Sequence, residues 1–244
     1  MQRYRSRAIG PCCAVALLLL LAGCATTRDF SSVKSLTPAA STAPAAAGPL
    51  TLVLMPADVE LSVLTAGGTL QPQAAWTDAA KSHLVTAVRE SPALSGKQLL
   101  TYVPPEAGEP AATTIAEIEH LHRAVGTAII MHKMAVPLPT KKDRFDWSLG
   151  RDAAVLKAHA KADYALFVYL RDSFSSTGRV LTQIFAAALG VGLQGGQQLG
   201  FATLVDLSSG DIVWFNFLSS ASGDTRDLAG AKTTVANLLE GMPR

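Results

Sequence analysis

The sequence predicts an α/β protein, in which a single mixed sheet carries packed helices. Short apolar runs typical of strands alternate with longer segments whose apolar residues recur at helical spacing. Helices between the early strands require crossover connections, which join parallel strands. Two late strands flank a short glycine-containing turn, which is typical of an antiparallel hairpin. At 244 residues and 49% hydrophobic content, the chain is long enough for one domain with a real core.

The strands are predicted from their composition and their boundaries. Residues 50–55 form a short apolar run that a proline ends. Asp58–Leu64 alternates polar and apolar residues, as a half-exposed extended segment does. Residues 164–170 are apolar on both faces, so this segment is expected to be the central strand. The remaining strands are expected at 99–103, 201–207 and 212–218.

Four helices are predicted from apolar residues spaced three and four apart. Their expected ranges are about 76–88, 114–135, 149–160 and 224–241. Asp224 is expected to open the last helix, and Gly241 to close it. The predicted order is therefore β-α-β-α-α-β, a glycine-rich insert, and then β-β-α.

The first 23 residues are expected to be a signal peptide that is removed. Three arginines within the first seven residues precede an apolar run at 14–21, which is too short to cross a bilayer. The residues Leu21, Ala22, Gly23 and Cys24 then resemble the lipobox of bacterial lipoproteins. That resemblance implies that Cys24 becomes the N-terminus and carries acyl chains. Two or more such chains give a stable membrane anchor.

Processing at Cys24 would change the charge and the cysteine content. Removing the three arginines from the 21 Lys and Arg residues leaves 18 against 19 Asp and Glu, so no basic excess indicates nucleic acid as a partner. Cys12 and Cys13 would leave with the signal, so the mature chain would have no disulfide and no free thiol. Ala25 lies where Asp favours inner-membrane retention in enterobacterial lipoproteins, so the resemblance implies the periplasmic face of the outer membrane.

The mature chain is expected to divide into a tether and a domain. Residues 24–48 are rich in Ala, Pro, Ser and Thr, which predicts a flexible tether. Residues 49–244 would form the periplasmic α/β domain. The hairpin at 204–214 reads V-D-x-x-x-G-x-I-V-W from Val205, and with the order of elements it resembles the small domain of curli-export, polysaccharide-export and penicillin-binding-protein-activator lipoproteins. This resemblance implies a non-enzymatic role in envelope assembly or export, often as an oligomer.

The segment 180–205 contains no charged residue. Its first half is nearly all apolar and its second half is rich in Gly and Gln. The favoured interpretation is a buried helix followed by a glycine-rich link. A subunit contact is the first alternative, because Ala186 with Gly190 and Gly196 with Gly200 have the small-xxx-small spacing of close helix contacts. Membrane insertion is the second, although the apolar stretch is too short to span a bilayer.

A candidate ligand site lies at the end of the central strand. Arg171, Asp172 and Arg179 flank an expected polar loop at 173–178, and strand ends are common ligand sites in α/β sheets. Glu119 and His122 share a helix face, but no further ligand is near in sequence, so no metal site is predicted. The sequence has no G-x-S-x-G motif and no phosphate-binding loop, so no catalytic residue is assigned.

The sequence thus predicts a lipid-anchored, non-catalytic periplasmic domain that acts as a scaffold or accessory in cell-envelope assembly or export, and that uses no cofactor. Its expected partners are the membrane, through the lipid on Cys24, and envelope proteins or further copies of itself, but no nucleic acid. The alternative is a binding module for a small ligand or glycan, using the loop after the central strand. A third possibility is a metal-assisted enzyme acting through Glu119 and His122.

Overall fold

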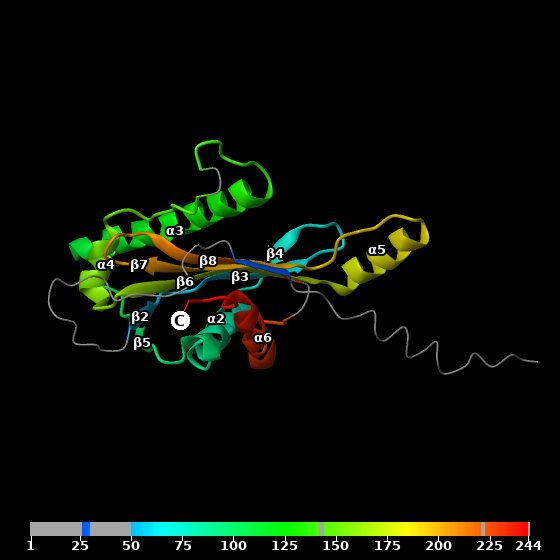
Figure 1. The fold of residues 1–244 in the computed structure, drawn as a ribbon. Helices are drawn as coiled ribbons and strands as arrows, with labels where there is room; N and C mark the ends of the chain where they lie inside the picture. The colour runs from blue at the N-terminus through cyan, green and yellow to red at the C-terminus, as the bar shows by residue number, and fades with distance from the viewer. Residues whose placement is uncertain (1–25, 30–49, 142–143, 221–222, 244) are drawn as a thin grey trace, which may run out of the picture.

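The computed structural model describes residues 26–29, 50–141, 144–220 and 223–243. The predicted signal peptide, Cys24 and most of the expected tether lie outside these residues. The described chain forms an eight-stranded mixed sheet with helices packed on both of its faces (Figure 1). The predicted α/β fold class is therefore confirmed.

The sheet is built around β6 (Tyr164–Ser175), the strand that the sequence predicts to be central. The strand order is β1-β8-β7-β6-β2-β5, and β3 joins the other part of β6 and carries β4. Pairing is parallel for β2 with β5, β2 with β6 and β3 with β6, and antiparallel from β6 through β7 and β8 to β1. The other strands are β1 (Thr26–Asp29), β2 (Thr51–Leu54), β3 (Asp58–Leu64), β4 (Leu70–Pro72), β5 (Gln98–Thr101), β7 (Gln198–Asp206) and β8 (Ile212–Ser220).

Two helical layers enclose separate cores. Helices α2 (Ala74–Arg89) and α6 (Leu228–Leu238) cover one face, where Trp214 is fully buried. Helices α3 (Pro110–Met134) and α4 (Ala153–Ala160) cover the other, over Phe201 and Phe215. The sequence places α6 correctly but assigns its start to Asp224. The N-cap is Asp227, whose carboxylate accepts a hydrogen bond from the Gly230 amide at 2.8 Å.

Helix α3 approaches the sheet closely at Gly126. A Cβ atom at this position would lie 2.2 Å from Cε2 of Phe201. The Phe201 ring is itself held by stacking on Tyr169 and Phe215, at centroid distances of 4.8 and 5.3 Å. The absence of a side chain at Gly126 therefore sets the spacing between this helix and the sheet.

The edge strand β1 differs from the sequence prediction. Thr26–Asp29 pairs antiparallel with β8, with Thr26 beside Ser219, and the Thr27 hydroxyl donates a hydrogen bond to the Glu240 carboxylate. The prediction of a flexible tether is wrong for these four residues. A strand of four residues is too short to show a periodic pattern, so the sequence does not distinguish it from the rest of the Ala- and Thr-rich segment.

Candidate functional site

The three sequence-predicted site residues do not meet at one site. Arg171 and Asp172 are consecutive on β6, so their side chains point to opposite faces of the sheet. Arg179 belongs to α5 (Thr177–Ala188), the helix that follows. The predicted polar loop is wrong, because β6 continues to Ser175 and α5 begins two residues later.

Arg171 is part of an ion-pair network on the α3 face. Its Nη2 lies 2.8 Å from Oδ1 of Asp58, and its guanidinium lies 4.2 Å from the ring centroid of Tyr169. The second Asp58 oxygen lies 2.7 Å from Nε of Arg123. One carboxylate thus joins β3, β6 and α3. Because these groups are partly exposed, each pair contributes little stability, and the arrangement indicates a positioning role within the fold.

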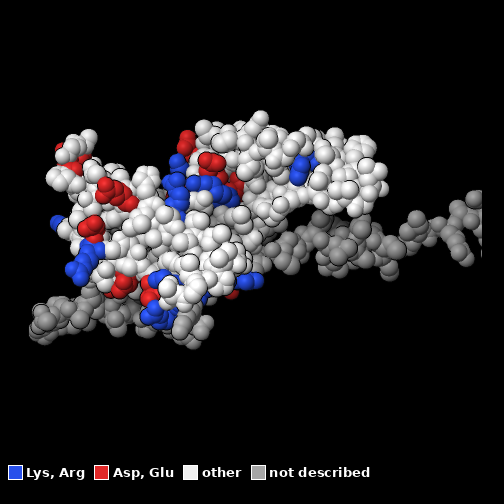
Figure 2. Space-filling model, turned by 90° about the horizontal axis from the view of Figure 1, so that it is seen from above, with Lys and Arg blue, Asp and Glu red and all other residues white. Residues whose placement is uncertain are grey.

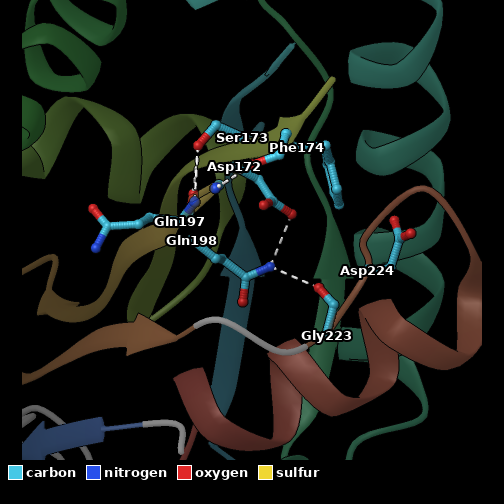
Figure 3. A pocket seen from close by; sticks show the side chains of 9 residues that line it. Asp172, Ser173, Phe174, Gln197, Gln198, Gly223 and Asp224 are labelled. Carbon is cyan, nitrogen blue, oxygen red and sulfur yellow. Dashed lines mark hydrogen bonds between the residues drawn. The ribbon is translucent and has the colours of Figure 1, made fainter. Parts of the chain in front are cut away.

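Asp172 faces the α2 and α6 side and lines a cavity of about 340 Å³ (Figure 3). The cavity lies between the end of β6, the start of β7 and the loop before α6. Asp172 is only 5% exposed. Its Oδ2 accepts hydrogen bonds from Nε2 of Gln198 at 2.9 Å and from the Thr225 hydroxyl at 2.7 Å. A buried carboxylate is therefore fixed in place at the cavity wall.

The neighbours of Asp172 hold each other in a single arrangement. Gln198 Nε2 also donates to the Gly223 carbonyl at 2.8 Å, and its Oε1 accepts from the Thr234 hydroxyl at 3.1 Å. Both ends of the Gln198 amide are thus used. Among the described residues, both side-chain hydrogen bonds to this carboxylate end on Oδ2, and the backbone amide of Thr225 adds a further hydrogen bond to the carboxylate.

The cavity is acidic, and its carboxylates differ in their partners. Asp224 is paired with Arg226, with Nη2 and Oδ2 2.5 Å apart, and this pairing lowers the pKa of Asp224. The Arg226 guanidinium also stacks on Phe174, at 3.8 Å from the ring centroid. Asp172 has no ion-pair partner among the described residues, and burial raises its pKa, although its hydrogen bonds from Thr225 and Gln198 oppose the rise.

Replacing Asp172 with Asn is expected to stabilise the domain at neutral pH. The amide oxygen can accept the two hydrogen bonds that Oδ2 accepts now, while the buried charge is removed. Because the pKa of Asp172 is higher in the folded protein than its ordinary value of about 3.8, ionising this carboxyl opposes folding, and the full penalty is present at pH values above the folded pKa. That penalty disappears as the pH falls through the folded pKa toward 3.8.

Urea unfolding of the wild-type protein and of Asp172→Asn, from neutral pH down to about pH 4, would test the prediction. The advantage of Asp172→Asn should be largest at neutral pH and should vanish in acid. The exposed Asp211, changed to Asn, is the matched control. An advantage of the Asp172→Asn variant that stays constant with pH would contradict the assignment of the effect to the buried charge.

His122, the residue considered for metal binding, is a core residue. It is buried, its Nε2 lies 2.7 Å from the Thr203 hydroxyl, and its ring stacks on Phe167 at 4.5 Å. Burial lowers its pKa to about 3, so the imidazole is neutral at physiological pH. Within the described ranges, no group of three or more His, Cys, Asp and Glu residues is placed to hold a metal ion.

Helix α5 projects beyond the end of the sheet as an arm (Figure 1). None of its residues is buried, and Phe185 and Leu189, which follows the helix directly, are 69% and 82% exposed. The favoured prediction of a buried helix is therefore wrong. The apolar run has the composition of a core helix, but no part of the sheet lies over it. The outward apolar side chains, here called the arm face, are Val180, Leu181, Ile184, Phe185, Leu189 and Val191.

The polar side of α5 faces the chain's own return segment. Nη2 of Arg179 donates to the Gln194 carbonyl at 2.7 Å, and Nε2 of Gln183 donates to the Leu193 carbonyl at 3.2 Å. Surface helices normally turn their polar side to water and their apolar side to the core. The arm does the reverse, so its apolar side is available to an outside partner.

A second group of exposed apolar side chains lies at the C-terminal end of α3. Val136 is 62% exposed, and its amide bonds back to the Met131 carbonyl at 2.8 Å. The group, here called the α3 patch, is Met131, Met134, Val136 and Leu138. Neither this patch nor the arm face could be recognised as exposed from the sequence, because apolar helical spacing also predicts burial.

In the described part of the chain, the fold and these surfaces define an open-sheet α/β domain with exposed apolar surfaces and an acidic cavity beside Asp172. No protein-family model and no curated protein matches the chain. The chain is similar to the PelC dodecamer from Paraburkholderia phytofirmans, with 14% identity over 91% of this chain and 99% of PelC and a TM-score of 0.38. A single-substitution PelC variant, also a dodecamer, gives 15% identity, 91% and 100% coverage and a TM-score of 0.37. Similarity this low transfers no function.

Among the described residues, no helix has the length and apolar content needed to cross a membrane.

Proposed function

We propose that this chain is a lipid-anchored, non-catalytic domain on the periplasmic face of the outer membrane, and that it serves as a scaffold or accessory in cell-envelope assembly or export. The lipobox at Leu21–Cys24 supports the anchor. The observation that carries the proposed role is the exposure of two apolar groups, the arm face on α5 and the α3 patch.

The arm face and the α3 patch support a protein that works by binding other molecules through apolar surfaces. Single exposed apolar side chains are ordinary on protein surfaces, but a contiguous group indicates an interaction site. The arm face gathers six such side chains on one short segment, and the α3 patch gathers four more. Envelope proteins and further copies of this chain are the partners we propose for the α3 patch.

Four of the described titratable groups with shifted pKa values have partners that give them a structural use. His122 is neutral and enclosed in the core, and Asp172 is fixed by Gln198 and Thr225. Asp146 and Asp224 have lowered pKa values because each accepts hydrogen bonds from a cationic neighbour, Lys141 and Arg226 respectively. These groups are committed to the fold or to surface pairs, which favours a non-catalytic role.

Photo-cross-linking in intact cells tests the proposal. A photoreactive amino acid at Val136 is expected to give adducts with an envelope protein or a second copy, identified by mass spectrometry. The same amino acid at Glu106, an exposed residue away from both apolar surfaces, is the control. Mass spectrometry of the native product should show an acylated Cys24. A strictly monomeric extracted protein that gives no adduct at Val136 would contradict the proposal.

A second candidate function is the binding of a small ligand or glycan in the Asp172 cavity. The observation that favours it is the buried carboxylate of Asp172, which lines the cavity and has no ion-pair partner among the described residues. A carboxylate without an ion-pair partner favours a ligand that donates hydrogen bonds, and more so one that is cationic.

A thermal-shift series with small amines and sugars tests this second function. A ligand that raises the melting temperature of the wild-type domain should lose its effect on Asp172→Asn, which turns a donor toward the cavity. Arg171→Ala is the matched control, because Arg171 lies on the opposite face of the sheet. Equal shifts in all three proteins would place the ligand elsewhere.

A further inference from the structure

The register of β1 shows from which end of the sheet the chain enters. Thr26 pairs with Ser219 on β8, Ser219 pairs with Leu199 on β7, and Leu199 pairs with Arg171 on β6. These residues form one row across the sheet. Only four residues of β6 follow Arg171 before the strand ends, about 13 Å at the usual rise. The first residue of β1 therefore lies toward the end of the sheet from which α5 projects, three strands across from β6.

The direction of β1 follows from its pairing with β8. β8 runs toward this end, and β1 is antiparallel to it, so the chain enters β1 from the α5 side. Cys24 precedes Thr26 by two residues, which can span at most about 7 Å. A lipid on Cys24 would therefore enter the membrane beside the arm.

From this geometry we infer that the arm face lies on the membrane leaflet that holds the Cys24 lipid, with its apolar side chains among the acyl chains. The inference rests on the proposed acylation of Cys24. It identifies the partner of α5 as a lipid surface, whereas the α3 patch, at the C-terminal end of α3, is the surface proposed for proteins.

The chemistry of the arm fits a lipid surface. No charged residue occurs from Val180 to Val205, and Figure 2 shows the end with α5 almost free of acidic and basic groups. A helix of twelve residues is about 18 Å long, too short to cross the hydrocarbon core, so it lies along the interface. The polar atoms of Arg179 and Gln183 already donate hydrogen bonds to the return segment. The outward side of α5 can therefore lose contact with water without leaving these atoms unbonded.

The anchor favours lipid over a second copy as the occupant. An acylated Cys24 keeps the leaflet next to the arm at all times, whereas contact between two arms would need a second molecule in the correct orientation. Burying the arm face in the leaflet needs no other partner and gains the usual hydrophobic stabilisation of apolar surface removed from water.

Spin labelling of the full-length, lipidated protein tests this placement. The mature chain has no free thiol once Cys24 is acylated, so Phe185→Cys can be labelled selectively with a nitroxide in vesicles of phosphatidylethanolamine and phosphatidylglycerol. The matched control is Val103→Cys, which is 67% exposed and lies beside α4, with its carbonyl 2.7 Å from His159. Both side chains are exposed, so neither variant should affect folding.

The label at position 185 should collide with oxygen and be shielded from a water-soluble nickel complex, and the label at 103 should show the reverse. A label at 185 that the nickel complex reaches as readily as the one at 103 would overturn the inference. The inference would also be overturned if neither oxygen nor the nickel complex reached the label at 185 and the spectra of these labels were broadened by one another. That result would indicate that a second copy covers the arm face. Mass spectrometry of the same sample distinguishes these results from an unmodified Cys24, which would overturn the proposed anchor and this inference together.

Discussion

Replacing Cys24 with Ser is expected to transfer the protein from the membrane to the soluble fraction. Each buried methylene of an acyl chain contributes about 0.8 kcal/mol to membrane binding, so losing all the chains removes nearly all of the attachment. The arm face alone, on a helix of twelve residues, would bind reversibly and be removed by washing. Fractionation of cells followed by immunoblotting measures the change.

Cys12→Ser is the control for this experiment. Cys12 lies within the predicted signal peptide, so its substitution should leave the mature protein and its membrane attachment unchanged. If Cys24→Ser stayed in the washed membrane fraction at the wild-type level, the proposed lipid anchor would be ruled out.

Replacing Gly126 with Ala is expected to reduce the free energy of unfolding by about 3 kcal/mol, the upper end of the usual range for overpacking. The new methyl group would overlap the Phe201 ring, which cannot move aside because Tyr169 and Phe215 stack against it. The better helix propensity of Ala offsets only about 1 kcal/mol of the clash. A loss of this size lowers the melting temperature by roughly 6–12 °C in a domain of this length.

Gly192→Ala separates the packing effect from the general effect of removing a glycine. A Cβ atom at Gly192 would have no neighbour within 4 Å, so its substitution should change the stability by less than about 0.5 kcal/mol. Denaturant unfolding of both variants gives the comparison. Equal stability of the two would show that α3 can move away from the sheet without loss.

Much of the sheet could be predicted because its strands carry strong local patterns. Residues 164–170 are apolar on both faces, a pattern typical of a strand that helices cover on two sides. These residues do form the centre of the sheet. The Gly210 turn predicted the antiparallel pair β7 and β8, and the alternation at 58–64 predicted β3. Periodicity within a few residues determines each of these features.

The misjudged features depend on what lies next to a segment in space. The apolar pattern of α5 is the same whether a sheet, a lipid or solvent covers it, so the sequence could not distinguish these cases. The partners of Asp172 come from Gln198 and Thr225, 26 and 53 residues away, and no local signal connects them. Arg171 and Asp172 are adjacent in sequence, yet the alternation of a strand places them on opposite sides of the sheet.

The docking of β1 onto β8 has a consequence for how copies of this protein would meet. If Cys24 is acylated as proposed, β1 begins only two residues after the anchor, and the domain would rotate with the anchor instead of moving freely on a long tether. Every molecule would then present the same side to the membrane. Neighbouring molecules would meet only in the plane of the membrane and in a few relative orientations. Such confinement raises the effective concentration of matching surfaces without adding any new contact.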